Sequence, residues 1–191
     1  MKRHIKKLSL IAAGLGFLAL AKPASAATTQ PINVTVTVDY ISVSVASATW
    51  AIGQIAANTI NISSAIAVTN DGNRQEDYSL SLAYTPGWTI GTGQSAGVDT
   101  FVMLALFTTT PVNTLNNTEF GEGGAGDDVV TTGALSASAT LFAKTAETVG
   151  AKGYDVAFSA VRSLYLNFRA PTSNTVSAQQ SMTVTVTAAA G

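Results

Sequence analysis

The sequence NVTVTVDYISVSVA, residues 33–46, alternates β-branched apolar residues with small polar residues almost without a break. Val34, Val36, Val38 and Tyr40 fall on one face of an extended chain, and the apolar residues after the adjacent pair Tyr40–Ile41 fall on the other. Fourteen residues at a rise of about 3.3 Å each would span about 46 Å, more than twice a usual strand. The stretch is therefore predicted to form either one bulged strand or two consecutive strands.

The first 26 residues have the pattern of a secretory signal peptide. Basic residues at positions 2, 3, 6 and 7 precede an apolar run over residues 8–21, and Ala24-Ser25-Ala26 fits a cleavage site. We therefore expect a secreted protein, extracellular or at the cell surface, without membrane insertion after cleavage. The expected organisation is a signal peptide over 1–26, an N-terminal extended strand over 27–40, and a β-sandwich domain over 41–191.

Charge and residue usage narrow the function classes. The sequence has no cysteine, and its single histidine, His4, belongs to the expected signal peptide. Disulfides and thiol chemistry are excluded, and zinc or redox metal centres are disfavoured. After residue 26, five basic residues stand against 11 acidic ones, which gives a side-chain net charge of −6. Without a basic patch, nucleic acid and anionic lipid are not expected partners.

Short segments with a two-residue apolar period follow the opening stretch. The segment FVMLALF is apolar on both faces, which predicts a central strand with neighbours on both sides. In the segment over 135–141 the small residues leave a short helix as the alternative. Turn residues separate these segments, and no long stripe of helical period appears. The fold class predicted is all-β, an antiparallel β-sandwich of Ig-like/Greek key or jelly-roll-like type. The expected strands are residues 60–68, 78–84, 101–107, 135–141, 164–168 and 182–186.

Two of these segments are predicted to pair with each other. Residues 60–68 end at Asn70-Asp71-Gly72-Asn73, four residues that tolerate positive φ, and residues 78–84 alternate again after a polar stretch. This arrangement is typical of a β-hairpin with a polar loop.

Two catalytic patterns occur without the residues that their chemistry needs. Gly93-Gln94-Ser95-Ala96-Gly97 matches a serine nucleophile elbow, which requires a preceding strand, a following helix and a histidine base. Residues 121–126 match a dinucleotide fingerprint, yet they lack a preceding strand and carry acids that would repel a pyrophosphate. Both are interpreted as loops, and we expect no enzyme.

Acidic residues gather in the loop that follows residue 110. Calcium takes six to eight oxygen ligands, which clustered carboxylates and backbone carbonyls can supply. The alternative is a solvated loop, because the spacing does not match a known calcium cage. No other cofactor is expected. The candidate calcium ligands are Glu119, Glu122, Asp127 and Asp128.

Four aromatic residues could form a sugar-stacking platform, namely Trp50, Trp88, Tyr78 and Tyr84. The alternative is that they belong to the core, where Trp and Tyr of sandwiches are common. With the acidic loop, these residues support an alternative function: a monomeric Ig-like extracellular binding module for a glycan or a surface protein.

A signal peptide followed directly by an alternating strand resembles the layout of TasA/camelysin-like and archaeal bundling-pilus subunits. The segments SSAIAVTNDGNRQEDYSLSL (63–82) and APTSNTVSAQQSMTVTVTA (170–188) are also similar to Ig-like surface domains. The resemblance implies a secreted filament subunit that assembles with copies of itself by donating a strand.

The residues support assembly by a physical argument of their own. A sandwich that lacks one strand leaves an open edge and an apolar groove, which an extended segment of a neighbour can fill. Residues 29–38 have the length and alternation for this, with a hinge at Tyr40–Ile41. The alternative is that 33–46 forms an ordinary bulged first strand of a monomer. The expected assembly residues are Val34, Val36, Val38 and Tyr40.

Overall fold

The computed structural model of the protein describes residues 32–46, 49–124, 127–144 and 152–191. The chain divides into two compact units between Thr37 and Val38. Residues 32–37 are the described part of the first unit, and the strands named below all belong to the second. The expected signal peptide lies outside the described residues.

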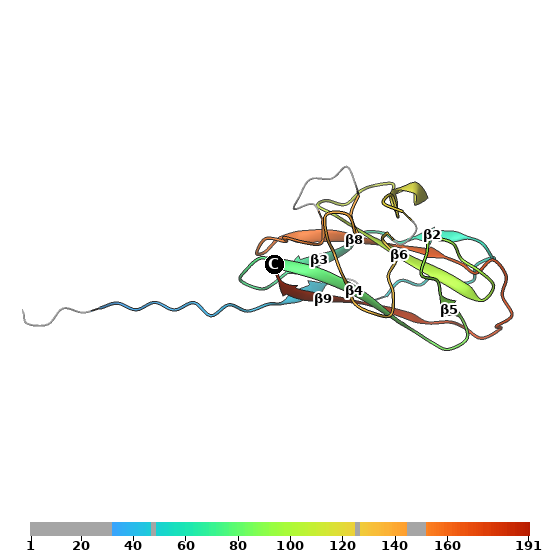
Figure 1. The fold of residues 1–191 in the computed structure, drawn as a ribbon, viewed down its shortest axis with the longest axis horizontal. Coiled ribbons are helices and arrows are strands. Elements are labelled where there is room, and N and C mark those ends of the chain that lie inside the picture. Colours follow the sequence, from blue (N-terminus) through green and yellow to red (C-terminus); the bar gives the residue numbers. More distant parts are fainter. Residues whose placement is uncertain (1–31, 47–48, 125–126, 145–151) are drawn as a thin grey trace, which may run out of the picture. The chain divides into compact units, whose positions relative to one another are not determined.

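The second unit is built from two β-sheets, as Figure 1 shows, and it confirms the all-β, sandwich-like class. A short 3-10 helix, η1 (Asn117–Glu119), lies between β6 and β7 in the chain. The larger sheet contains β1 (Val43–Val45), β2 (Ile60–Ile62), β3 (Ile66–Asn70), β5 (Thr89–Ile90), β6 (Thr100–Thr108) and β8 (Val161–Arg169). The smaller sheet contains β4 (Glu76–Tyr84), β7 (Leu135–Ser136) and β9 (Met182–Ala190).

The strand order leaves different elements at the sheet edges. The larger sheet has the order β1-β3-β8-β6-β5, and β2 pairs with the far end of β8. The smaller sheet has the order β7-β4-β9. All pairs are antiparallel except β5 with β6, and β4 pairs with β9 along all nine residues of both strands. Strand β9 therefore ends the smaller sheet.

The core lies between the two sheets and follows the two-residue period of the strands. On β4, Tyr78, Leu80 and Leu82 are buried in it, and on β6 the odd-numbered residues from Phe101 to Phe107 are buried in it. The even-numbered residues of β6 join a second buried cluster with Phe120 and other residues. The prediction that residues 101–107 form a strand covered on both faces is confirmed. Within the sheet this strand pairs with β8 over seven residues and with β5 over two, so it is central only at its start.

The predicted hairpin is wrong. Strand β3 pairs with β1 and β8, whereas β4 pairs with β7 and β9, so the two strands lie in different sheets. The segment 60–68 is also interrupted at Ser63, whose N–H donates to the Leu166 carbonyl and whose hydroxyl accepts from the Leu166 N–H. An alternating pattern specifies which face is buried, and it does not specify the partner strand.

Two further strand predictions hold only in part. Of the segment 135–141, only Leu135–Ser136 is a strand. Of residues 33–46, only Val43–Val45 pairs within the sheets, where it forms the edge next to β3.

Candidate assembly surfaces

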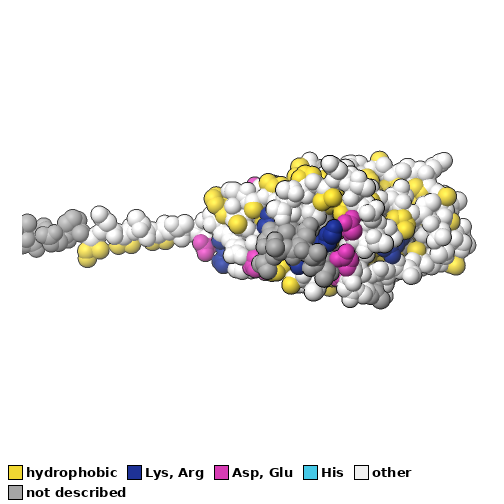
Figure 2. Space-filling model, turned by 90° about the horizontal axis from the view of Figure 1, so that it is seen from above, with side chains coloured by type: hydrophobic (Ala, Val, Ile, Leu, Met, Phe, Trp, Pro, Cys, Tyr) yellow, Lys and Arg dark blue, Asp and Glu magenta, His cyan; other side chains and the backbone are white. Residues whose placement is uncertain are grey.

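The valines of the opening stretch are exposed. The exposed fractions are 88% for Ile32, 78% for Val34, 80% for Val36 and 77% for Val38, and no strand is assigned among the described residues before Val43. Figure 2 shows hydrophobic side chains in a row along one face of this segment. We call residues 32–38 the arm. A contiguous row of exposed apolar side chains is the kind of surface that mediates protein contacts, so the arm is a candidate assembly surface.

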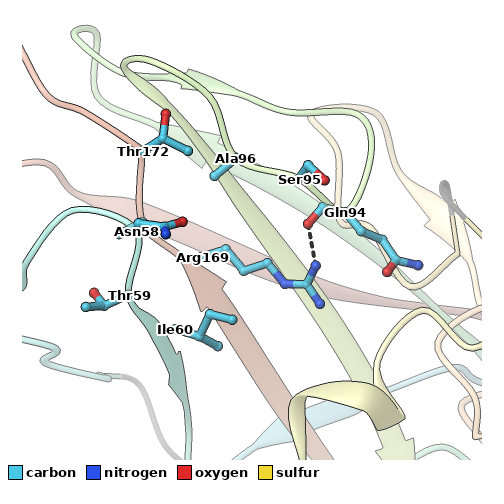
Figure 3. A pocket seen from close by; sticks show the side chains of 9 residues that line it. Asn58, Thr59, Ile60, Gln94, Ser95, Ala96, Arg169 and Thr172 are labelled. Carbon is cyan, nitrogen blue, oxygen red and sulfur yellow. Dashed lines mark hydrogen bonds between the residues drawn. The ribbon is translucent and has the colours of Figure 1, made fainter.

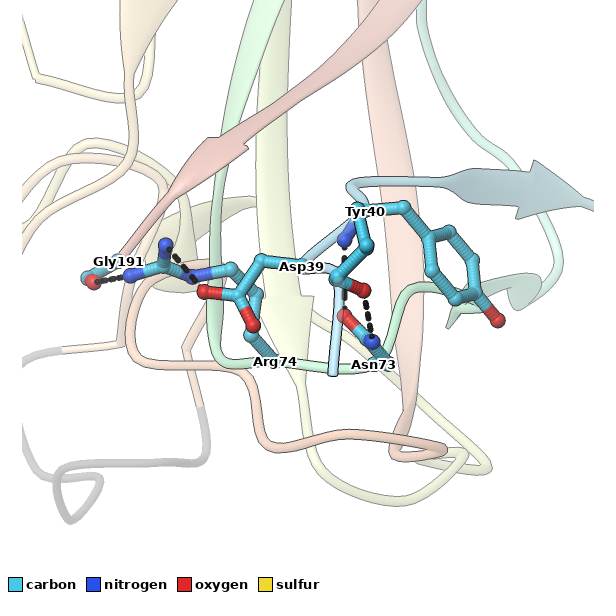
Figure 4. Close-up of polar contacts among 6 residues, drawn as sticks. Asp39, Tyr40, Asn73, Arg74 and Gly191 are labelled. Carbon is cyan, nitrogen blue, oxygen red and sulfur yellow. Dashed lines mark hydrogen bonds and ion pairs between the residues drawn. The ribbon is translucent and has the colours of Figure 1, made fainter. Parts of the chain in front are cut away.

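From the last residue of the arm onward, the chain is bound by Asn73 in the loop between β3 and β4 (Figure 4). The Asn73 side chain donates to the Val38 carbonyl at 2.8 Å and accepts from the Tyr40 N–H at 2.9 Å. Its own backbone N–H donates to the Tyr40 carbonyl at 3.2 Å. Tyr40 itself is 53% exposed. The held segment thus includes the expected hinge at Tyr40–Ile41.

Charge and a buried carboxylate complete this attachment. Arg74 forms an ion pair with Asp39 at 3.3 Å, and the Ser42 N–H donates to Oε1 of the fully buried Glu76 at 2.8 Å. A larger residue at position 72 would force a shift, because a Cβ there would lie 2.2 Å from the same oxygen of Glu76 and 2.8 Å from the backbone carbonyl oxygen of Tyr40. Sequence reasoning missed Asn73 and Glu76, although Asn70-Asp71-Gly72-Asn73 marked the loop.

Strand β9 has a free edge. The Thr85 N–H donates to the Ser181 carbonyl, and the Gly191 N–H donates to the Gln75 carbonyl, so odd-numbered residues of this strand bond to β4. In an antiparallel pair the bonded residues alternate, and the even-numbered residues from Met182 to Ala190 therefore point their N–H and C=O groups away from β4. No strand pairs with this side of β9 among the described residues, although Cα atoms of β1 come within 8 Å of β9 without pairing with it. This row of groups can accept a further strand.

The side chains of β9 are also incompletely covered. Met182, Val184, Val186 and Ala188 pack against the core but remain half-buried, while the threonines between them are exposed. By contrast, Arg162 to Phe168 of the central strand β8 are all buried. The inward side chains of β9 are therefore covered like those of a core strand that lacks a neighbouring strand on one side.

The side of β6 away from β8 is covered in a different way, because beyond its short pairing with β5 it is bonded to loops. The Ala105 N–H donates to the Asp128 carbonyl, and the Phe107 N–H donates to the Phe142 carbonyl, so two loop segments cover this edge. The carboxylate of Asp128 joins them, accepting from the Gly121 N–H at 2.7 Å and the Ala143 N–H at 3.2 Å. Burial raises the pKa of Asp128 to about 7, against the opposing effect of these hydrogen bonds.

The candidate calcium ligands are used in local contacts. Glu119 forms an ion pair with Lys144, which lowers the pKa of the carboxyl group, and it accepts from the Asn116 N–H. Asp127 accepts from the Gly123 N–H at 2.7 Å, and Glu122 is exposed. Within the described ranges no three such residues come together as a metal-binding group. Calcium binding stays a prediction.

The candidate aromatic platform lies in or against the core. Tyr78 is fully buried, and the Trp88 ring stacks on Phe168 with centroids 6.2 Å apart. Tyr84 meets Phe101 edge-on, and Trp50 packs against the same cluster. These contacts fit the alternative that the four aromatic residues belong to the core, because their ring faces pack against other side chains.

The two motif-like loops lie next to each other. The Gln94 side chain donates to the Gly121 carbonyl at 2.7 Å and to the Gly124 carbonyl. Ser95 is exposed in the loop before β6, and no helix follows it there. Gly126 lies outside the described residues. The only histidine in the sequence is His4, so the hydroxyl of Ser95 has no imidazole base in the second unit.

Comparisons with known proteins add no identity. Neither protein-family models nor curated proteins nor solved structures gave a match to this chain. Among the described residues there is no helix of the length and apolar character needed to cross a membrane. The resemblance to filament subunits stays a prediction, and the function is argued below from the two surfaces just described.

Proposed function

We propose that this protein is a secreted, non-enzymatic structural subunit of an extracellular filament or surface layer. The arm of one copy adds as a strand to the free edge of β9 in another copy. The observation that carries this proposal is the exposure of the four alternating apolar side chains at Ile32, Val34, Val36 and Val38.

Exposure of these side chains is unfavourable in water. Burying one valine or isoleucine contributes about 1.5–3 kcal/mol, so an extended segment with four such residues gains much from a groove that covers one face. The conformational entropy that the arm loses when it becomes ordered on binding offsets part of this gain. Strand addition also supplies main-chain hydrogen bonds, which need no particular side chains.

The edge of β9 matches the arm in length and alternation. The nine residues of β9 include five positions whose N–H and C=O groups face outward, the even-numbered residues from Met182 to Ala190. The side chains of the first four are half-buried, and that of Ala190 is exposed. With Thr35 opposite Thr185, Val34 and Val36 lie opposite the two valines of β9, and threonines lie opposite threonines. Such cross-strand pairs stabilise a sheet by roughly 0.2–1 kcal/mol each. We expect this register in an antiparallel arrangement, which is slightly more stable per residue than a parallel one.

The arm and the β9 edge are different surfaces of the same chain. A contact between two different surfaces is head-to-tail, and it generates a ring or an open filament depending on the rotation between copies. A low content of charged residues, 11% of the sequence, leaves few charges to oppose packing of copies.

The experiment removes residues 27–37 and retains Val38, whose carbonyl is bound by Asn73. Negative-stain electron microscopy and size-exclusion chromatography of the intact mature chain are expected to show polymers. The deleted chain is expected to be a folded monomer with an unchanged melting temperature. Polymers that persist after the deletion, or a mature chain that stays monomeric at high concentration, would contradict the proposal.

A further inference from the structure

A cavity of about 350 Å³ opens beside the end of β8, and no residue of β9 lines it. It lies between the end of β8, the start of β2 and the loop before β6. Six of its nine lining residues are polar, and no acidic residue is among the described residues that line it. The polar lining residues are Asn58, Thr59, Gln94, Ser95, Arg169 and Thr172.

Arg169 is the charged group of this cavity, as Figure 3 shows. Its side chain is half-buried, and burial lowers its pKa. One guanidinium nitrogen donates to the Gln94 carbonyl, and another donates to the Asn117 side-chain oxygen at 3.0 Å. Its Nε is buried and has no acceptor among the described residues. A guanidinium has five N–H groups, so donors remain.

Among the residues that the structure describes, no carboxylate forms an ion pair with Arg169, in contrast to two other cations of the chain. Arg74 pairs with Asp39 at 3.3 Å, and Lys144 pairs with Glu119. A cation removed from water without an opposite charge is unfavourable, and an anionic group placed beside it restores that charge. A planar carboxylate suits the forked geometry of the guanidinium.

The neutral groups around Arg169 indicate the rest of the ligand. Ser95 and Thr172 offer hydroxyls, and Asn58 offers an amide. The Thr59 hydroxyl donates to the Ala56 carbonyl and the Gln94 amide donates to the Gly121 and Gly124 carbonyls, so these two side chains offer their oxygens as acceptors. Together these groups both donate and accept, which suits a ligand with several hydroxyls. Three hydroxyls and two amides around one cation are a polar environment that a fatty acid or an aromatic acid would not use.

We propose that this cavity binds a carboxylate-bearing sugar, a uronic acid, with the carboxylate beside Arg169 and the sugar hydroxyls on the surrounding hydroxyl and amide groups. The volume, about 350 Å³, is at the small end of the range for ligand pockets, which fits a single sugar unit. The site is independent of the assembly proposal, because none of its residues lies on the arm or on β9.

The test is isothermal titration calorimetry of the mature chain with sodium glucuronate and sodium galacturonate at fixed ionic strength. At least one uronate is expected to bind tenfold or more tightly than glucose, which lacks the carboxylate, and than acetate, which lacks the hydroxyls. Equal binding of acetate and uronate, equal binding of glucose and uronate, or no binding of either uronate would overturn the proposal.

Variants locate the site. Arg169→Gln is expected to abolish uronate binding, and Arg169→Lys is expected to weaken it about tenfold, because the charge stays and the fork is lost. The control is Arg74→Gln, a surface arginine away from the cavity, which is expected to leave the affinity unchanged.

Arg169 also donates hydrogen bonds to the Gln94 carbonyl and the Asn117 side chain, so replacing it could disturb the fold. A second variant therefore leaves Arg169 in place. Ser95→Ala combined with Thr172→Val changes two exposed side chains at the cavity wall, and it is expected to weaken uronate binding at least fivefold with an unchanged melting temperature. An affinity equal to that of the unmodified chain in this double variant would overturn the assignment.

Discussion

The sequence VTVTV at 34–38 and the sequence TVTVT at 183–187 are nearly the same ribbon, and they have opposite environments. Val34, Val36 and Val38 are at least 77% exposed, whereas Val184 and Val186 are half-buried against the core of the sandwich. The second ribbon pairs along its length with β4, and the first pairs with no strand among the described residues. Alternation therefore specifies a strand with one apolar face, and its partner is set elsewhere in the chain.

The largest expected difference between the two ribbons is in folding stability. Val184→Ala with Val186→Ala removes apolar contacts from the core side of β9, and we expect the free energy of unfolding to fall by about 2–4 kcal/mol. Val34→Ala with Val36→Ala is the matched control, and we expect a change within about 0.5 kcal/mol. Urea unfolding of dilute, monomeric protein measures both. Equal losses for the two pairs would remove the contrast on which the comparison depends.

The edge of β6 sharpens the contrast with the edge of β9, because two loop segments joined by Asp128 cover it. Burial raises the pKa of Asp128 to about 7, so the folded protein keeps this proton between about pH 4 and pH 7, where the unfolded chain has released it. Stability from this group is therefore greatest below about pH 4 and falls as the pH rises toward 7.

The matched variant is Asp128→Asn, which cannot titrate. The difference in unfolding free energy between the unmodified chain and this variant is expected to change by roughly 3 kcal/mol between pH 4 and pH 7, with the unmodified chain losing stability as the pH rises. Chemical unfolding at a series of pH values measures it. A constant difference across that range would show that Asp128 titrates normally.

A smaller effect is expected where the arm joins the sandwich. Asn73→Ala removes the two side-chain hydrogen bonds to Val38 and Tyr40, and we expect a loss of about 1 kcal/mol. Amide exchange at residues 40–42 should become faster, while exchange in β6 and β8 stays the same. Asn113→Ala, in an exposed loop, is the control. Unchanged exchange at residues 40–42 in the Asn73 variant would show that this side chain does not hold the segment.

Sequence reasoning predicted the all-β class, the strand covered on both faces and the strands that became β8 and β9, because their apolar periods are long and regular. It failed for the hairpin of residues 60–84, since the partner of a strand depends on contacts that are distant in sequence. Asp128 was predicted as a calcium candidate, and its contacts with Gly121 and Ala143 became visible only in the fold. The cavity beside Arg169 was missed for the same reason, because its lining comes from three separate segments.

The central claim is that the arm of one copy pairs with β9 of another, and disulfide cross-linking between copies tests it most directly. The sequence has no cysteine, so Thr35→Cys in one preparation and Thr185→Cys in a tagged second preparation introduce the only thiols. In the proposed register these residues are opposite each other at a separation that suits a disulfide. We predict that oxidation of the mixture gives the 35–185 cross-link in high yield, and that Asn113→Cys in place of Thr185→Cys gives little. Assembled protein without the 35–185 cross-link would contradict the claim.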